Sequence, residues 1–144
     1  MVLNPIDKSN YLRGLLILIK IHRSINEIEK KRIKEVSSVL GFNRGFVDNA
    51  INELLDNEYL IETPPKFTNP RLAETFIKEA IKISMSENVL NIHNLHWLIA
   101  LADNNNLPKQ WLFMELEFLL ENENQNINDS LEIQNYLNEE ATAA

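Results

Sequence analysis

Apolar residues recur along the chain every three or four positions, the spacing that places them on one face of an α-helix. The first such stretch predicts a helix that begins at Asp7 or Ser9 and ends near His22. Its apolar face comprises Tyr11, Leu12, Leu15, Leu16 and Ile19. The middle of the stretch, Leu15 to Ile21, is apolar at nearly every position, so its own pattern also allows a β-strand.

Side chains that cap helices mark the next two elements. Asn26, with Glu29 three residues later, has the spacing of a capping box, in which each side chain accepts a hydrogen bond from the backbone amide of the other residue. The helix that starts there is expected to end at Gly41, and Asn43 is expected to cap a third helix. The apolar stripe of that third helix is Phe46, Val47, Ile51, Leu54 and Leu55.

Prolines separate the chain into two halves. The segment Leu60 to Pro70 contains three prolines and predicts an extended connector. Asn69, directly before the last of them, is expected to cap a fourth helix that runs to about Ser86. Asn91 then caps a fifth helix and Pro108 opens a sixth. The apolar residues of these two helices are Leu95, Leu98, Ile99 and Ala102, then Trp111, Leu112, Leu116, Leu119 and Leu120.

The two halves repeat each other. When the chain is laid over itself with a constant shift of 65 residues, apolar positions coincide without a gap. The matched pairs include Tyr11 with Phe76, Leu12 with Ile77, Ile33 with Leu98, Val36 with Leu101, Phe46 with Trp111, Val47 with Leu112, Ile51 with Leu116 and Leu54 with Leu119. We therefore predict an all-α fold of six to seven helices built from a duplicated three-helix unit. The repeat also favours helix over strand for Leu15 to Ile21, because its partner segment in the second half reads as a helix.

The repeats span about residues 8–60 and 73–122 within a single predicted domain, residues 1–125. Residues 126–144 form an acidic, Asn-rich C-terminal segment, predicted as a solvated tail or as a short helix from Ser130 to Glu139. Apolar residues in this segment would let it fold against the domain or against a partner. They are Leu131, Ile133, Tyr136 and Leu137.

Composition narrows the class of protein. The chain has 144 residues, of which 44% are hydrophobic and 24% charged, as in ordinary globular domains. It has no cysteine, which excludes disulfides, thiolate metal sites and cysteine nucleophiles. The longest apolar run is far shorter than the roughly 20 residues that span a bilayer, and the N-terminus does not read as a signal peptide. We therefore expect a cytoplasmic protein without a membrane span.

Charge is distributed unevenly. The net charge is −7, which disfavours unspecific attraction to nucleic acid or anionic lipid. Residues 1–72 hold 11 Lys and Arg against 9 Asp and Glu, whereas residues 73–144 hold 3 against 12, giving net charges of +2 and −9. The two halves are therefore expected to attract each other.

The order of helices, with a short loop after the first helix of each unit, resembles the TerB-like family of tellurite-resistance and stress-related domains over residues 8–121. Family members carry Asp-Gly-x-Ile-Asp in that loop and a Glu near the start of the next helix. Here the first loop reads His22-Arg23-Ser24-Ile25-Asn26, and Glu29 stands at the position of the family Glu. The second loop reads Glu87-Asn88-Val89-Leu90-Asn91, with Asn94 in place of the Glu. The resemblance implies the helical frame and a stress- or defence-related role, whereas the acidic signature that implies metal binding is missing.

Residues that carry chemistry are sparse. His93 and His96 are three apart on one helix and could share a metal ion, but no spacing fixes a further ligand such as His22 or Asp103. The sequence has no catalytic triad pattern, glycine-rich phosphate loop or nucleophile elbow. We therefore expect no enzyme activity and no catalytic, cofactor-binding or metal-binding residues.

One basic cluster stands out. In a helical projection Lys30, Lys31 and Lys34 share the outward face, whereas Arg32 lies nearer the apolar arc, where it is expected to pair with Glu29. The three lysines are the candidate surface for a protein partner or for phosphate. The alternative is a solvated face that balances the acidic second half.

A rival architecture is a winged helix-turn-helix over Ile33 to Ile61, with its turn at Gly41 to Asn43. The helix that would read DNA offers Arg44 as its only cation. Its three acids, Asp48, Glu53 and Asp56, would repel phosphates. Nucleic acid is therefore not the expected partner.

The preferred hypothesis is a non-enzymatic module that binds a protein partner, because the helical frame is complete while a reactive group of residues is not recognisable. The second is a metal-responsive TerB-like domain, and the third a DNA-binding module of the winged-helix type.

Overall fold

The computed structural model describes residues 3–22, 26–54, 62–85, 92–121 and 130–143, and these residues form seven α-helices and no strand. The helices are α1 (Pro5–His22), α2 (Glu27–Leu40), α3 (Arg44–Leu54), α4 (Pro70–Ser84), α5 (Ile92–Asn104), α6 (Lys109–Glu121) and α7 (Glu132–Ala143). The predicted all-α class is confirmed, and Leu15 to Ile21 is helical.

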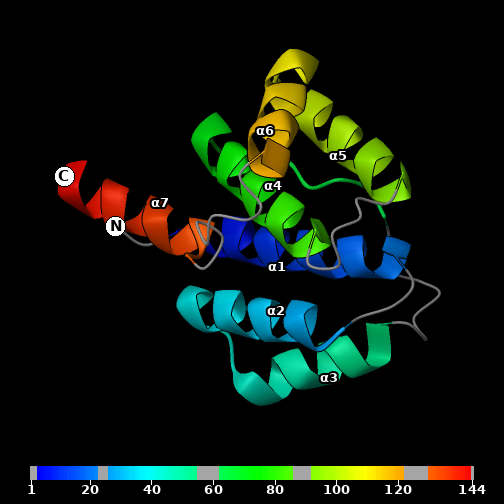
Figure 1. Cartoon of the computed structure of the whole chain (residues 1–144). Helices are drawn as coiled ribbons and strands as arrows, with labels where there is room; N and C mark the ends of the chain where they lie inside the picture. The colour runs from blue at the N-terminus through cyan, green and yellow to red at the C-terminus, as the bar shows by residue number, and fades with distance from the viewer. Residues whose placement is uncertain (1–2, 23–25, 55–61, 86–91, 122–129, 144) are drawn as a thin grey trace.

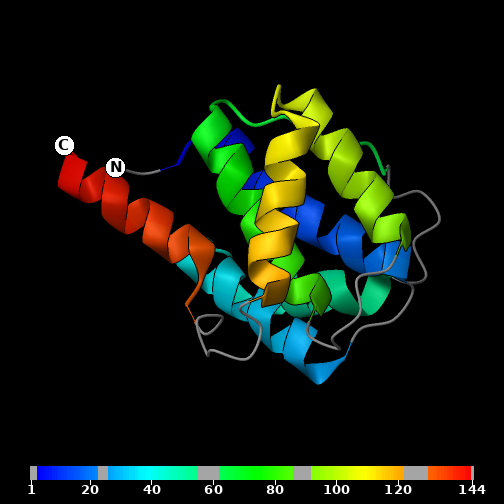
Figure 2. The same cartoon turned by 45° about the horizontal axis from the view of Figure 1, so that its top comes forward.

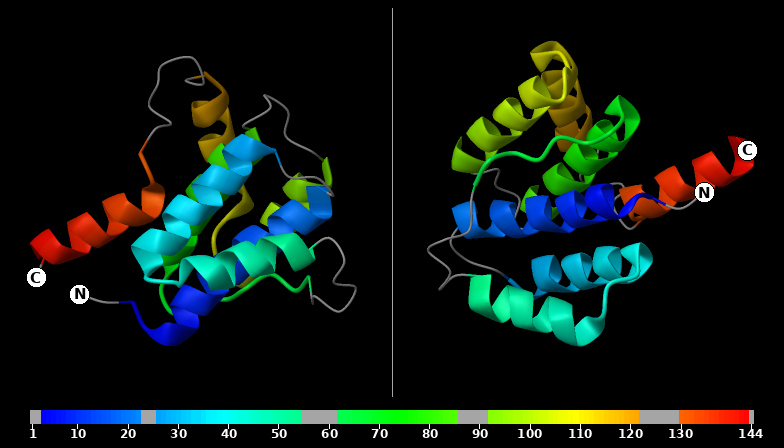
Figure 3. Two further views of the ribbon diagram at one scale, coloured as in Figure 1. Left: turned by 90° about the horizontal axis from the view of Figure 1, so that it is seen from below. Right: turned by 180° about the vertical axis from the view of Figure 1, so that it is seen from behind.

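The helices form two groups on either side of α1 and α4. α2 and α3 pack together on one side, and α5 and α6 pack together on the other (Figure 1). Views from below and from behind show the same separation (Figure 3). α7 packs along α4 and also contacts α2. Surfaces on α2 and on α6 therefore belong to opposite sides of the molecule.

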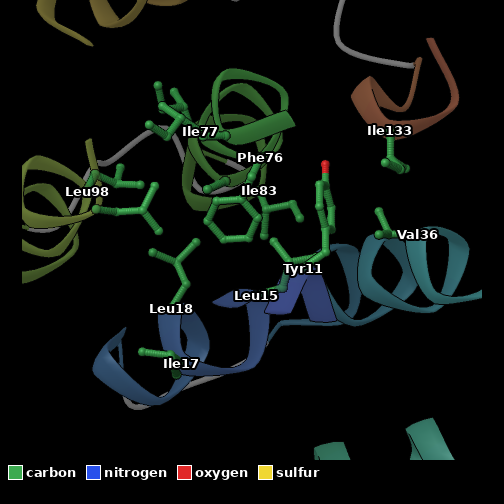
Figure 4. Packing of buried hydrophobic residues seen from close by; sticks show 14 of the residues in the cluster. Tyr11, Leu15, Ile17, Leu18, Val36, Phe76, Ile77, Ile83, Leu98 and Ile133 are labelled. Atoms are coloured by element: carbon green, nitrogen blue, oxygen red, sulfur yellow. The ribbon is translucent and has the colours of Figure 1, made fainter. Parts of the chain in front are cut away.

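A hydrophobic core joins the two groups. An aromatic cluster lies at its centre, where the ring of Phe76 contacts Tyr11, Phe67 and Trp97 with centroid separations of 5.2, 5.4 and 6.1 Å. Figure 4 shows Tyr11 of α1 between Phe76 of α4 and Ile133 at the start of α7. α7 therefore contributes to the same core as the preceding helices.

Burial agrees with the sequence repeat at several matched positions. Tyr11 and Phe76 are both fully buried, as are Ile33 and Leu98. Amphipathic helices of unrelated origin also bury matching positions, so the duplication of a three-helix unit stays a prediction.

The helix ends follow local sequence signals. Asn26 accepts a hydrogen bond from the amide of Glu29 at 2.7 Å, and the amide of Asn26 donates to the Glu29 carboxylate at 3.1 Å, which confirms the capping box. Gly41 ends α2 with φ of 88°, a left-handed conformation that glycine adopts without strain. Asn69 caps α4 ahead of Pro70 as predicted. The predicted cap Asn91 lies outside the described residues.

Three expectations need correction. α1 begins at Pro5 rather than at Asp7 or Ser9, because the Asn4 side chain accepts the amide of Asp7 and proline suits the first helical position. Phe46 and Leu120 were assigned to apolar stripes, but they are 57% and 50% exposed. Each lies at the edge of its stripe, and Phe46 stacks on Phe42 instead of entering the core. The side chain of Leu54, and Leu55, lie outside the described residues.

Asn105 holds the described part of the connector against the end of α5. Its side-chain oxygen accepts the amide of Phe67 at 2.8 Å, and its amide group donates to the carbonyls of Pro65 and Leu101 at 3.0 and 2.8 Å. The residue is 5% exposed, so water does not replace these bonds readily. The buried amide of Asn105 therefore makes two of the hydrogen bonds that hold the connector, to Phe67 and Pro65.

We expect the substitution Asn105→Ala to lower the free energy of unfolding by about 2 kcal/mol, because buried backbone donors and acceptors lose their partners. Asn104 is a matched control, since it is exposed and makes one comparable bond, to the carbonyl of Pro64 at 3.0 Å. Asn104→Ala is expected to cost less than about 1 kcal/mol. Urea unfolding of both variants measures the difference, and equal losses would contradict the assignment.

α7 is attached through a buried carboxylate of α4. The Glu79 side chain accepts the amides of Glu132 and Ile133 at 3.1 and 3.2 Å and the hydroxyl of Tyr11 at 3.3 Å. It thus caps the N-terminus of α7 from outside the helix. At the other end of α7, Arg71 contacts the carboxylates of Glu139 and Glu140, each at 2.7 Å. Residues 130–143 therefore dock on the domain, with a helix over Glu132–Ala143, in agreement with the predicted short helix rather than a solvated tail.

Candidate functional site

The three predicted surface lysines line one groove. Lys30, Lys31 and Lys34 lie along α2, and Arg44 at the start of α3 joins them around a cavity of about 580 Å³. Val39 and Leu131 supply apolar lining, and Glu27 and Glu35 supply acidic lining. We call this surface the basic groove.

Part of the positive charge in the basic groove is neutralised locally. Lys34 forms a salt bridge with Asp48 of α3 at 3.0 Å, and Lys31 approaches Glu35 at 4.0 Å. Lys30 and Arg44 have no ion pair with any residue that the structure describes. The groove therefore combines cations, acids and apolar surface, which suits a polypeptide better than a compact phosphate.

The winged-helix alternative gains no support from α3. Asp48 stands on the face of α3 that meets Lys34, so an acid lies beside the cations that would approach phosphates. The end of the rival motif, up to Ile61, lies outside the described residues. The Glu29–Arg32 pair stays a prediction, although Glu29 is buried as expected.

The described residues do not assemble a metal site. They contain no group of three or more His, Asp or Glu side chains placed to hold an ion. His93 and His96 are both exposed. Glu29 is engaged in the capping box, and Asn94, at the corresponding position of the second half, is buried with its amide 3.5 Å from the Ser84 hydroxyl. The side chain of His22, residues 23–25 of the first predicted loop and the whole of the second loop lie outside the described residues.

Two ionisable groups with a shifted pKa, Tyr11 and Glu79, lie in the interior. Burial raises the pKa of the Glu79 carboxyl, and the hydrogen bonds from the backbone amides of Glu132 and Ile133 partly oppose this shift. The pKa of Tyr11 is raised first by burial and then by the negative charge of Glu79. Tyr11 is fully buried and Glu79 is 1% exposed. Glu79 accepts the amides at the start of α7 and the Tyr11 hydroxyl, so both side chains help to hold α7.

A second candidate surface, which the sequence patterns did not single out, lies on α6. One side of this helix packs on α4 and α5 through Leu112, Leu116 and Leu119. The other side carries Phe113, Met114 and Phe118, which are 44%, 69% and 54% exposed. The signal was present in the sequence, because large apolar residues occur on every side of this helix and not only on the side that packs on the core.

Acidic residues run along the same side of α6. Phe113, Glu117 and Glu121 follow each other at four-residue intervals, and Met114 and Phe118 form the neighbouring row. Glu117 and Glu121 are exposed. We call these five residues the α6 outer face, and Figure 2 shows α6 itself at the front of the molecule. It is an apolar surface divided by negative charge.

Comparisons of the chain with protein-family models, with curated protein sequences and with solved structures found no match. The TerB-like resemblance therefore stays a prediction. Within the described residues, no helix is long and apolar enough to cross a membrane.

Proposed function

We propose that this chain is a non-enzymatic protein-interaction module that binds its partner through the α6 outer face. The observation that carries the proposal is the exposure of Phe113 and Met114, at 44% and 69%, on a helix whose opposite side is already buried in the core. Large neighbouring apolar side chains on one helix face are typical of interaction sites. Burying them against a partner releases about 25 cal/mol per Å² of apolar area.

The partner's chemistry follows from the charges on this face. Glu117 and Glu121 lie beside the apolar residues, so an apolar partner without cations would leave two carboxylates desolvated and unpaired. A helical segment with Lys or Arg among apolar residues satisfies both parts of the surface. The partner is therefore a protein that displays a basic amphipathic helix.

The non-enzymatic part of the proposal is supported by the position of the perturbed groups, since Tyr11 and Glu79 are enclosed beneath α7. The TerB-like resemblance supplies the stress- or defence-related part. Neither the metal-responsive nor the DNA-binding alternative is favoured by a particular observation in the described residues.

Selection from a displayed library of random helical peptides tests the proposal without assuming a sequence. We expect enriched peptides to place Lys or Arg between apolar residues at helical spacing. The variant Phe113→Ser/Met114→Ser should weaken their binding by about tenfold or more, as removal of central apolar contacts does at interfaces. Its free energy of unfolding should change by less than about 0.5 kcal/mol, because both side chains are exposed.

The variant Ile6→Ser/Ile92→Ser is the matched control. It removes two apolar side chains that are 69% and 64% exposed and belong to α1 and α5. Peptide binding should be unchanged in this control. Enrichment of acidic peptides, or equal losses in the two double variants, would contradict the proposed site.

A further inference from the structure

We infer that the α6 outer face of one copy of this chain binds the basic groove of a second copy, so that copies associate head to tail. The inference rests on the proposed function, in which the α6 outer face binds a protein, and it names that protein. The observation that carries it is complementarity: α2 displays lysines beside the half-buried Val39 and Leu131, and α6 displays glutamates beside exposed apolar side chains.

The two surfaces have matching charges. Lys30 and Lys34 of α2 are four residues apart, as are Glu117 and Glu121 of α6. Each pair therefore spans about 6 Å along its helix. When the two helices lie side by side, two lysines meet two glutamates at the same spacing, and Lys30 gains a carboxylate that no described residue gives it within one copy.

The two surfaces also match in their apolar parts. The basic groove has a volume of about 580 Å³ and includes the half-buried side chains of Val39 and Leu131. Met114 and Phe118 stand beside the two glutamates on α6 and are mostly exposed. Insertion of these side chains into the groove covers apolar surface on both partners.

The contact has to form between copies. α2 and α6 lie on opposite sides of the molecule, separated by α1 and α4 (Figures 1 and 3). Pairing of α6 with the same helix of a second copy is unfavourable, because it brings the glutamates of one face against those of the other. The net charges of +2 for residues 1–72 and −9 for residues 73–144 favour a head-to-tail arrangement in addition.

A head-to-tail contact uses two different surfaces, and every copy carries both. Such heterologous contacts do not end at a dimer unless a ring closes. The mean mass of the complex should therefore increase with concentration beyond that of two chains, unless one of the two surfaces is removed.

Sedimentation velocity of the full chain, from about 1 µM to about 1 mM, measures this association. We expect the mean mass to rise above 16.7 kDa with concentration. In about 500 mM NaCl the association should be at least about tenfold weaker than in about 50 mM NaCl, because salt screens the charges. A constant mass of one chain at low salt would overturn the inference.

Two variants separate the surfaces. Lys30→Glu/Lys31→Glu reverses two of the four cations of the basic groove and leaves α6 intact. It adds acids near the N-terminus of α2, where the helix dipole favours them, and it removes the exposed Lys31–Glu35 contact. Phe113→Ser/Met114→Ser removes the α6 outer face and leaves the groove intact. Each variant alone should stay a monomer. An equimolar mixture should form a complex of two chains and nothing larger, because one intact surface of each kind remains.

The variant Lys8→Glu/Lys66→Glu changes the net charge equally outside the groove and should associate like the wild type. Association that survives either surface variant would overturn the inference, as would a mixture that stays monomeric. If the wild type does not associate but selected basic peptides still bind α6, the inference fails while the proposed function stands. If the wild type does not associate and no basic peptide binds α6, the proposed function is contradicted as well.

Discussion

Replacing Glu79 with alanine is expected to lower the free energy of unfolding by about 3 kcal/mol and to detach α7. The substitution leaves the amides of Glu132 and Ile133 and the hydroxyl of Tyr11 without their acceptor. Tyr11 is fully buried, so water does not reach its hydroxyl. Relief of the buried charge offsets part of the loss, because burial disfavours the ionised carboxylate. Chemical denaturation gives the total, and amide hydrogen exchange reports detachment of α7.

Removal of residues 130–144 separates the cap of α7 from other effects of Glu79. In the shortened chain the carboxylate keeps only the Tyr11 hydroxyl among its three described partners. Glu79→Ala should therefore cost less than about 1 kcal/mol there. An equal cost in both chains would show that Glu79 does not act through α7.

The pH dependence of stability provides an independent check on Glu79. Its pKa is raised from the ordinary 4.5, chiefly by burial, so the folded chain binds this proton more tightly than the unfolded chain. The pH-dependent part of this stability, which comes from the tighter binding of the proton in the folded chain, is complete below pH 4.5 and is lost as pH rises through the raised pKa. Glu132 and Lys82, the charged neighbours of this group, pair with each other at 2.6 Å. Glu79→Gln should lose this component of the pH profile, and an unchanged profile would contradict the assignment.

The parts of the fold that were predictable from sequence depend on neighbours in the chain. Asn26 and Glu29 form a capping box within four residues, and the C-terminal role of Gly41 depends on one backbone angle. Such signals set where helices begin and end. The start of α1 is set by an equally local pair, the cap Asn4 and Pro5 at the first helical position, which lies ahead of the predicted start at Asp7 or Ser9.

Contacts between distant segments could not be predicted in this way. Glu79 meets the amide of Ile133 across 54 positions, and Asn105 meets that of Phe67 across 38. Nothing in the surroundings of a single Glu or Asn reveals a partner so far along the chain. The burial of each polar side chain follows from the packing of α7 or of the connector, which the local pattern does not encode.

The two candidate surfaces also differ in how far the sequence predicts them. Lys30, Lys31 and Lys34 could be placed on one outward face because they share a helix, and the structure adds Arg44 from the next helix. The α6 outer face was missed because Phe113 and Met114 count as apolar in any helical pattern, whether buried or exposed. The side of an apolar helix that faces solvent is decided by which other helices pack against it, and the local sequence pattern does not contain this information.

The second large effect is expected at Gly14, where α1 approaches the aromatic cluster. A β-carbon placed on this residue would lie 2.5 and 2.8 Å from two ring atoms of Phe76. The ring has little room to move, because Tyr11, Phe67 and Trp97 pack around it. In an open helix, alanine would gain about 1 kcal/mol over glycine. Here we expect Gly14→Ala to lower the free energy of unfolding by about 2 kcal/mol instead, since overpacking of the core dominates.

A second substitution in the same contact tests this cause. Phe76→Leu removes the ring atoms that the added methyl group would meet, at a cost of its own of about 2 kcal/mol. In the double variant Gly14→Ala/Phe76→Leu the clash is absent and the helix preference of alanine remains. The double variant should therefore be at least as stable as Phe76→Leu alone. If the two losses simply add in urea unfolding, glycine is required at this position for a reason other than the close approach of α1 and α4.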